Sequence, residues 1–132
     1  MSTPNLFLDS SALFAGVVSS TGASRALLLL AEAKMIAITI SEQVIVETER
    51  AVTRKIPRAI PAYRETLRSA NLQIIPTPTT LEIEPHLDII SHQADIPIVV
   101  AAMKAQTDYL VTLNRKHFID DPAVAAQSGL RI

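Results

Sequence analysis

Short apolar segments alternate with longer segments of helical composition along most of the chain. Apolar runs bounded by turn residues or prolines are typical of strands that are buried on both faces. The pattern predicts four such strands, at residues 6–8, 35–40, 72–76 and 108–112, and residues 129–132 are a candidate fifth.

Helices are predicted between these strands, from about residue 12 onward and at residues 22–33, 41–55, 61–70, 79–91 and 95–106, with a break at Pro85. Ser10 and Ser11 are expected to cap the first of them and Ser41 the third, because a serine hydroxyl accepts a hydrogen bond from a first-turn amide. Pro97 fits only a first turn, so the last helix of this set is expected to begin at or next to Asp95. Residues 114–118 are expected to form a short turn or helix.

Strands that are apolar throughout and alternate with helices indicate a parallel sheet covered by helices on both faces. We therefore expect an α/β protein, with residues 1–132 forming a single domain, because a chain of this length supports one core. Ligands of such sheets bind beyond the carboxyl ends of the strands. The residues that directly follow the strands are therefore the first candidates for a functional site.

Composition supports a folded protein with an aliphatic core, since 48% of the residues are hydrophobic, 19% are charged and 4% are aromatic. Cysteine is absent, which excludes disulfides, thiolate metal ligands and a cysteine nucleophile. The sequence has no signal-peptide pattern and no apolar run long enough to span a membrane, so a cytoplasmic location is expected. A net charge of −1 predicts no general attraction to nucleic acid, so RNA binding would need a local basic patch.

Three acidic residues are expected near one edge of the sheet. Asp9 directly follows the first strand, Glu47 lies in the helix after the second, and Asp95 lies at the start of the helix before the fourth. Each also has an ordinary structural interpretation: Asp9 and Asp95 could cap a turn or a helix, and Glu47 could pair with Arg50 or Arg54 on an exposed helix face. Spacing alone leaves both interpretations open.

Carboxylates that converge within a few ångströms cannot all stay ionised without a counter-cation. A ligand set of oxygen atoms favours Mg²⁺ or Mn²⁺ over zinc, and Mg²⁺ keeps coordination positions free for phosphate oxygens. If the three carboxylates converge, the arrangement suits metal-assisted hydrolysis of a phosphodiester bond.

Three blocks of sequence, in this order, resemble the signature blocks of the PIN-domain family, and of its bacterial VapC-like toxin ribonucleases in particular: FLDSSALFAG, SEQVIVETERAV and ADIPIVVAAMKAQTDYLVTLNRKHF. The resemblance covers nearly the whole chain, from Leu6 to Phe118. It implies a three-layer α/β/α sandwich with a central parallel sheet of four to five strands. It also implies cleavage of RNA with Mg²⁺, or Mn²⁺, bound by Asp9, Glu47 and Asp95.

The family frequently carries a fourth acidic residue after the last of these strands, and by the resemblance Asn114 stands at that position. An amide oxygen can ligate a metal ion but adds no negative charge, so a second cation should bind less tightly. By the same resemblance Thr112 orients a carboxylate or a water molecule, and Ser11 is a candidate for the same role. Structural roles in capping or turns are equally compatible with both hydroxyls.

Basic residues after the last strand are candidates for substrate binding. Arg115, Lys116 and His117 are consecutive and could contact phosphates, although a solvated turn explains them equally well. His86 and His92 share no metal-ligand spacing with each other or with His117, and both are expected to be surface residues. Further basic side chains could form a patch or could equally pair with Glu49 and Glu65; they are concentrated in the middle of the chain: Arg54, Lys55, Arg58, Arg64 and Arg68.

We therefore expect a metal-dependent endoribonuclease that is the toxin of a toxin–antitoxin pair, with RNA as substrate, an antitoxin protein as partner and a homodimeric state. The alternative is a PIN-fold interaction module with weak or no cleavage activity. An aspartyl phosphatase of another α/β family is disfavoured, because the position two residues after Asp9 holds Ser11 rather than a second Asp. The apolar residues 26–31 are a candidate dimer contact, although burial in the monomer core explains them equally well.

Overall fold

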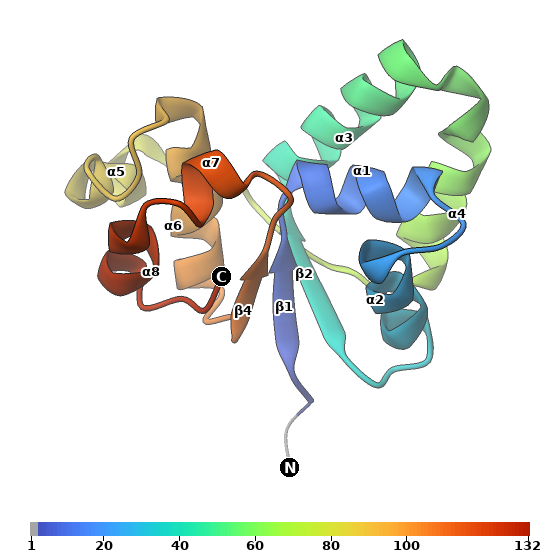
Figure 1. Cartoon of the computed structure of the whole chain (residues 1–132), viewed down its shortest axis with the longest axis horizontal. Helices are drawn as coiled ribbons and strands as arrows, with labels where there is room; N and C mark the ends of the chain where they lie inside the picture. Colours follow the sequence, from blue (N-terminus) through green and yellow to red (C-terminus); the bar gives the residue numbers. More distant parts are fainter. Residues whose placement is uncertain (1–2) are drawn as a thin grey trace.

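The computed structural model describes residues 3–132 and shows a sheet between two groups of helices (Figure 1). Across these residues the sheet has four strands in the order β3-β2-β1-β4, and all neighbours are parallel. The candidate fifth strand contributes a single parallel bridge between Tyr109 and Arg131. The predicted α/β architecture is confirmed, with the strands β1 (Asn5–Leu8), β2 (Ala37–Ser41), β3 (Gln73–Ile75) and β4 (Tyr109–Val111).

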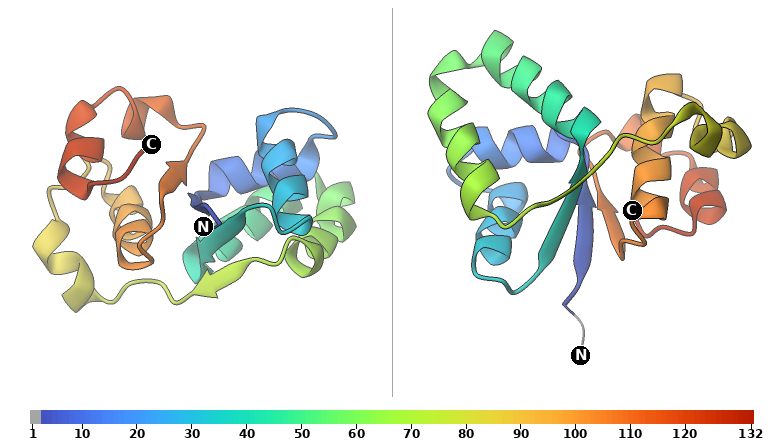
Figure 2. Two further views of the ribbon diagram at one scale, coloured as in Figure 1. Left: turned by 90° about the horizontal axis from the view of Figure 1, so that it is seen from below. Right: turned by 180° about the vertical axis from the view of Figure 1, so that it is seen from behind.

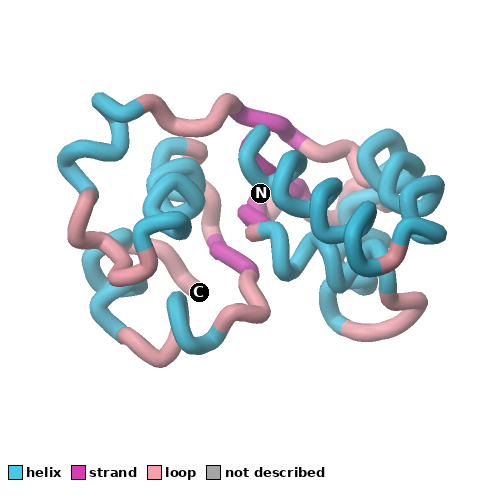
Figure 3. Tube along the Cα trace, turned by 90° about the horizontal axis from the view of Figure 1, so that it is seen from above, coloured by secondary structure: helices cyan, strands magenta, loops and turns pink. Residues whose placement is uncertain are grey.

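The two groups of helices lie on opposite sides of the sheet, as the views from below and behind show (Figure 2). The first group consists of α1 (Ser10–Val18), α2 (Ala23–Glu32), α3 (Glu42–Lys55), η1 (Pro57–Ala59) and α4 (Ile60–Ser69). The second group consists of α5 (Thr80–Ile83), η2 (Glu84–His86), η3 (Gln93–Asp95), α6 (Ile96–Lys104), α7 (Arg115–Phe118) and α8 (Pro122–Ser128). A view of the chain from above shows the strands between the two groups (Figure 3). Within residues 3–132 no single helix is long and apolar enough to cross a membrane, and α1 and α2 reach that length only as a pair bent by 86°.

The start of α1 differs from the sequence prediction. The helix begins at Ser10, and the side chain of Asp9 caps it by accepting a hydrogen bond from a first-turn amide at 3.0 Å. The prediction that Ser10 and Ser11 are the caps is wrong, because the carboxylate takes the amide and the Ser11 hydroxyl instead donates to that carboxylate. The predicted cap of α3 is confirmed, since Ser41 Oγ accepts from the backbone N–H of Val44.

The region between β3 and α6 is less helical than predicted. Helical structure from residue 80 ends at His86, just after Pro85, and the chain then turns until η3. α8 had no counterpart in the prediction, although Asp121 as N-cap and Pro122 in the first turn mark its beginning.

The core is aliphatic, as the composition predicts. Burying one such side chain stabilises the fold by about 1.5–3 kcal/mol. β1, β2 and β4 supply side chains to this core and α1, α3 and α6 pack on them; the residues that are at most 1% exposed include Phe7, Leu8, Leu13, Ile38, Ile40, Val44, Val99 and Leu110. This packing fixes the carboxyl ends of β1 and β4, where the candidate site lies.

Gly16 allows α1 and α2 to approach closely. A Cβ atom at this position would lie 2.6 Å from Leu28 Cδ1 and 3.1 Å from the carbonyl oxygen of Ser24. Gly16→Ala is therefore expected to lower the free energy of unfolding by about 1–3 kcal/mol through overpacking, even though alanine is the better helix former by about 1 kcal/mol. Urea unfolding followed by circular dichroism measures this change, and a variant as stable as the parent would contradict the close contact.

Candidate active site

Asp9 is a buried carboxylate at the junction of β1 and α1, with 5% of its surface exposed. Its Oδ1 atom accepts hydrogen bonds from the Ser11 hydroxyl at 2.7 Å and from the backbone N–H of Ala12 at 3.0 Å. Its Oδ2 atom accepts a hydrogen bond from the Thr112 hydroxyl at 2.5 Å. Both carboxylate oxygens are therefore held in a fixed orientation.

The same two hydroxyls connect Asp9 to the segment that follows β4. Thr112 Oγ1 accepts a hydrogen bond from the N–H of Asn114 at 2.9 Å, and Ser11 Oγ accepts one from the N–H of Leu113 at 3.0 Å. Each hydroxyl donates to the carboxylate and accepts from the loop, so the β4–α7 connection and the start of α1 form one hydrogen-bonded unit. Thr112 and Ser11 therefore orient the Asp9 carboxylate, and their supporting role in a reaction stays a prediction.

The environment of Asp9 disfavours its charge. Burial raises the pKa of the Asp9 carboxyl above its ordinary value of 3.8, and the negative charge of Asp95 acts in the same direction. Hydrogen bonds from Thr112, Ser11 and the Ala12 amide oppose this shift of the pKa without cancelling it. A buried carboxylate beside a second carboxylate would be stabilised in its charged form by a cation at this place.

Asp95 ends η3 and directly precedes α6. Its backbone is already helical, and within residues 3–132 its side chain accepts no capping hydrogen bond, so the ordinary capping interpretation does not hold for it. Instead, Asp95 Oδ2 lies 2.8 Å from His117 Nδ1 and 3.1 Å from His92 Nδ1. The two imidazole rings are stacked, with centroids 4.2 Å apart and an angle of 18° between their planes.

The interaction of His92 and His117 with Asp95 was not predicted from the sequence. His92 is exposed, as expected of a surface residue, but its contact with Asp95 was not predicted. For His117 the sequence left open a phosphate contact or a solvated turn, and its Nδ1 atom is directed at the same carboxylate. The spacing of three residues between His92 and Asp95 indicates that their side chains can meet within one helical turn. The approach of α7 to Asp95 depends on the tertiary fold and could not be predicted from the sequence.

Glu47 lies on α3, partly exposed, at the edge of the same region. Its Oε2 atom accepts a hydrogen bond from Gln43 Nε2 at 3.2 Å, and the same nitrogen lies 3.3 Å from the carbonyl oxygen of Ala94, the residue before Asp95. Gln43 therefore links the Glu47 carboxylate to the start of α6. Within residues 3–132 Glu47 forms no ion pair, so the pairing with Arg50 or Arg54 considered for it is not observed.

Asn114 is the N-cap of α7. Its Oδ1 atom accepts a hydrogen bond from the backbone N–H of His117 at 3.1 Å, and its Nδ2 atom lies 2.8 Å from His117 Nδ1. The amide oxygen thus has a structural partner, and the metal-ligand role expected for Asn114 stays a prediction. Arg115 and Lys116 are exposed in the first turn of α7, and in the described part of the chain neither forms an ion pair.

The family model described as PIN domain matches residues 5–116. The chain belongs to the PIN-domain family. A solved structure similar to this PIN domain is that of VapC20 from Mycobacterium tuberculosis, described as a sarcin-ricin loop cleaving toxin; the TM-score is 0.57, the sequence identity is 17%, and the match covers 84% of this chain and 91% of VapC20. No curated protein matches the sequence. The family expected from the three sequence blocks is therefore confirmed, as is the likeness to the VapC fold.

The donor atoms of this PIN domain fit a divalent cation. Asp9, Asp95 and Glu47 offer the oxygen atoms that Mg²⁺ and Mn²⁺ prefer. Within residues 3–132 one ligand atom each from His92, Asp95 and His117 lie within 4.8 Å of one another. Of the three predicted carboxylates only Asp95 belongs to this cluster, and Asp9 and Glu47 lie outside it. Imidazole is a better ligand for transition metals such as Mn²⁺ than for Mg²⁺.

Proposed function

We propose that this PIN domain is a divalent-metal-dependent endoribonuclease and the toxin of a toxin–antitoxin pair. The observation that carries the proposal is Asp9, a buried carboxylate that three donors hold at the carboxyl rim of the sheet, close enough to Asp95 for the charge of Asp95 to raise its pKa. Membership of the PIN-domain family and the similarity to VapC20 support the same activity.

We propose Asp9, Glu47 and Asp95 as the ligands of Mg²⁺ or Mn²⁺, with Asn114 as a further oxygen ligand. A bound divalent ion would supply the positive charge that lowers the pKa of the attacking water and offsets the charge on the phosphate oxygens. The hydroxyls of Ser11 and Thr112 hold the two carboxylate oxygens of Asp9 in one orientation at the carboxyl end of β1.

Each of the other two carboxylates has its own support. Gln43 holds Glu47 through its amide, and the imidazoles of His92 and His117 hold Asp95. Without a cation, the Nδ1–H tautomer of His117 can donate to Asp95 Oδ2, whereas a cation beside Asp95 would require the proton on Nε2, so that the lone pair of Nδ1 faces the cation. Arg115 and Lys116 are placed on α7 to contact substrate phosphates near these groups.

Protein partners are proposed on the same basis. An antitoxin would bind at the carboxylate rim, where an arginine could pair with the carboxylates.

A second copy of the chain is proposed to bind at α2, because Leu28 and Ala31 are buried in the monomer while Leu29 and Leu30 stay exposed. Leu29→Glu is therefore expected to convert a dimer to a monomer, which light scattering after size exclusion measures; a dimer that persists in the variant would contradict this contact.

The experiment that tests the proposed function is cleavage of a mixed panel of structured and single-stranded RNAs by the purified protein with Mg²⁺, Mn²⁺ or EDTA. Cleavage that requires a divalent metal would support the ribonuclease, and we expect Mn²⁺ to act at a lower concentration than Mg²⁺. Absence of both cleavage and calorimetric metal binding would contradict the proposal and favour a PIN-fold interaction module.

A further inference from the structure

One face of α3 carries Gln43, Glu47, Arg50 and Arg54. These positions follow the spacing i, i+4, i+7 and i+11, which places the last three within about 60° of one another around the helix axis at 100° per residue. At the beginning of this row, Gln43 Nε2 donates a hydrogen bond to the carbonyl oxygen of Ala94, the residue before Asp95. The row therefore starts at the candidate active site with a carboxylate and continues away from it with two guanidinium groups.

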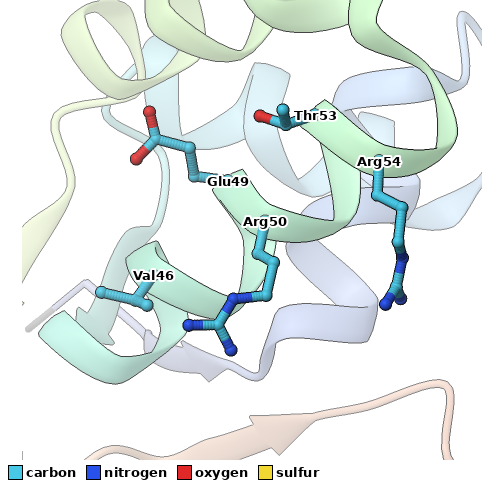
Figure 4. A pocket seen from close by; sticks show the side chains of 5 residues that line it. All are labelled: Val46, Glu49, Arg50, Thr53 and Arg54. Carbon is cyan, nitrogen blue, oxygen red and sulfur yellow. The ribbon is translucent and has the colours of Figure 1, made fainter.

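The two arginines line an open hollow of about 420 Å³ on the outer face of α3, together with Val46, Glu49 and Thr53 (Figure 4). Arg50 and Arg54 extend from the same side of the helix, whereas Glu49 and Thr53 extend from the other side (Figure 4). The hollow thus has one basic wall and one wall that carries an acidic group. A polyanion in it would follow the arginine wall, because the charge of Glu49 repels it from the opposite wall.

Arg50 and Arg54 are both exposed, and within residues 3–132 no acidic side chain forms an ion pair with either. By contrast, Arg68 on α4 pairs with Glu65 at 2.7 Å. Two unpaired guanidinium groups next to each other repel, and that cost is offset when they share an anionic ligand. Guanidinium groups bind phosphate oxygens through two parallel N–H donors.

The rise of an α-helix gives the distances along the helix axis between the residues of this row. Arg50 lies about 4.5 Å beyond Glu47 along the helix axis, and Arg54 lies about 6 Å beyond Arg50, at 1.5 Å per residue. One helical turn is comparable to the distance between successive phosphates of an extended single strand. The two arginines can therefore contact two consecutive phosphates on one side of the bond that is cleaved.

We propose that Arg50 and Arg54 form a phosphate-binding subsite that guides single-stranded RNA along α3 away from the active site. This inference rests on the proposed ribonuclease function and adds the path of the substrate on one side of the cleavage point. An oligonucleotide long enough to reach α3 uses both arginines, and a dinucleotide does not reach them.

The test combines binding and cleavage with the full chain. Binding of a fluorescein-labelled octauridine is measured by anisotropy in the Asp9→Asn background, so that the RNA stays intact. Arg50→Gln with Arg54→Gln is expected to weaken binding roughly tenfold at low salt and to reduce the slope of log affinity against log salt by about 1.4, or about 0.7 for each lost phosphate contact. In the Asp9-containing enzyme the same pair should slow cleavage of the octauridine and leave cleavage of a dinucleotide unchanged.

The matched control is Arg68→Gln, which removes the same charge near the end of α4, at the opposite end of the sheet from the rim. Octauridine affinity and salt slope that stay at the parent's values in the double variant would overturn the subsite and assign this face to another partner, such as an acidic protein segment. An equal loss in Arg68→Gln would also overturn it, because the effect would then be one of net charge. Cleavage by the parent is measured separately, so failure of the proposed function is recognised independently of RNA binding at α3.

Discussion

Replacing Asp95 or Asp9 with Asn is expected to reduce metal-dependent RNA cleavage by about 100-fold or more, because each change removes one negative charge from the proposed ligands of the divalent ion. Asn is close in shape to Asp, so the contacts of His92, His117 and the Thr112 hydroxyl can persist around the new amide. Single-turnover cleavage with saturating Mg²⁺ or Mn²⁺ measures the effect on the reaction step.

The matched control for these two variants is Asp88→Asn, which removes an exposed carboxylate in the segment between η2 and η3. Asp88→Asn is expected to cleave at the rate of the parent. If Asp9→Asn and Asp95→Asn also cleaved at that rate, the carboxylates would not bind the metal ion that the reaction needs, and the assignment of the site would be wrong.

Asp9→Asn also has a distinct effect on stability in EDTA. Since burial raises the pKa of Asp9, the folded protein keeps a proton on this carboxyl at pH values where the unfolded chain has lost it. The free energy of unfolding of the parent therefore falls as the pH rises from the ordinary value of 3.8 through the raised pKa, and it stays lower above that window. Asn does not titrate, so the variant should be at least as stable as the parent at neutral pH, and it should lose the stabilisation that Mn²⁺ gives the parent. Thermal unfolding at several pH values, with and without Mn²⁺, measures both effects.

The sequence was sufficient to predict that the residues after the strands lie together at one edge of the sheet. Apolar segments that alternate with helical ones predict a parallel sheet, and the residues after its strands must lie at one edge. Asp9 and Thr112 follow β1 and β4, which are neighbours in the sheet, so their contact is a consequence of strand order. Strand order itself was not predicted, because it depends on packing between segments that are distant in the sequence.

The surroundings of Asp95 could not be predicted in the same way. The sequence places Asp95 at a helix start, where a capping role is common. The 3-10 turn before α6 gives its backbone a helical conformation, so its carboxylate makes no capping hydrogen bond to the first-turn amides of α6. The carboxylate then meets an imidazole from the preceding loop and one from α7. Such a contact depends on side-chain directions in two separate elements, which periodicity does not specify.

His117→Asp is expected to tighten Mg²⁺ binding roughly tenfold, because Mg²⁺ prefers carboxylate oxygen to imidazole nitrogen. In both side chains the ligand atom is bonded to Cγ, so a carboxylate oxygen of the variant can take the place of Nδ1, which lies 2.8 Å from Asp95 Oδ2. Two ionised carboxylates at that distance repel, so in EDTA the variant should be less stable than the parent by at least about 1 kcal/mol. Added Mg²⁺ should restore the stability, and isothermal titration with Mg²⁺ and Mn²⁺ measures the change in preference.

The isosteric control for this prediction is His117→Asn, which removes the imidazole without adding charge. It should bind Mn²⁺ more weakly than the parent and show no gain in Mg²⁺ affinity. Asn114→Asp provides a second comparison, because the Asn114 side chain caps α7 and hydrogen-bonds to His117, whereas His117 contacts Asp95 directly. A larger gain in Mg²⁺ affinity for His117→Asp than for Asn114→Asp would identify residue 117 as the position that completes the carboxylate set. If His117→Asp and His117→Asn bound Mg²⁺ equally well, the cation would not be held at Asp95 beside residue 117.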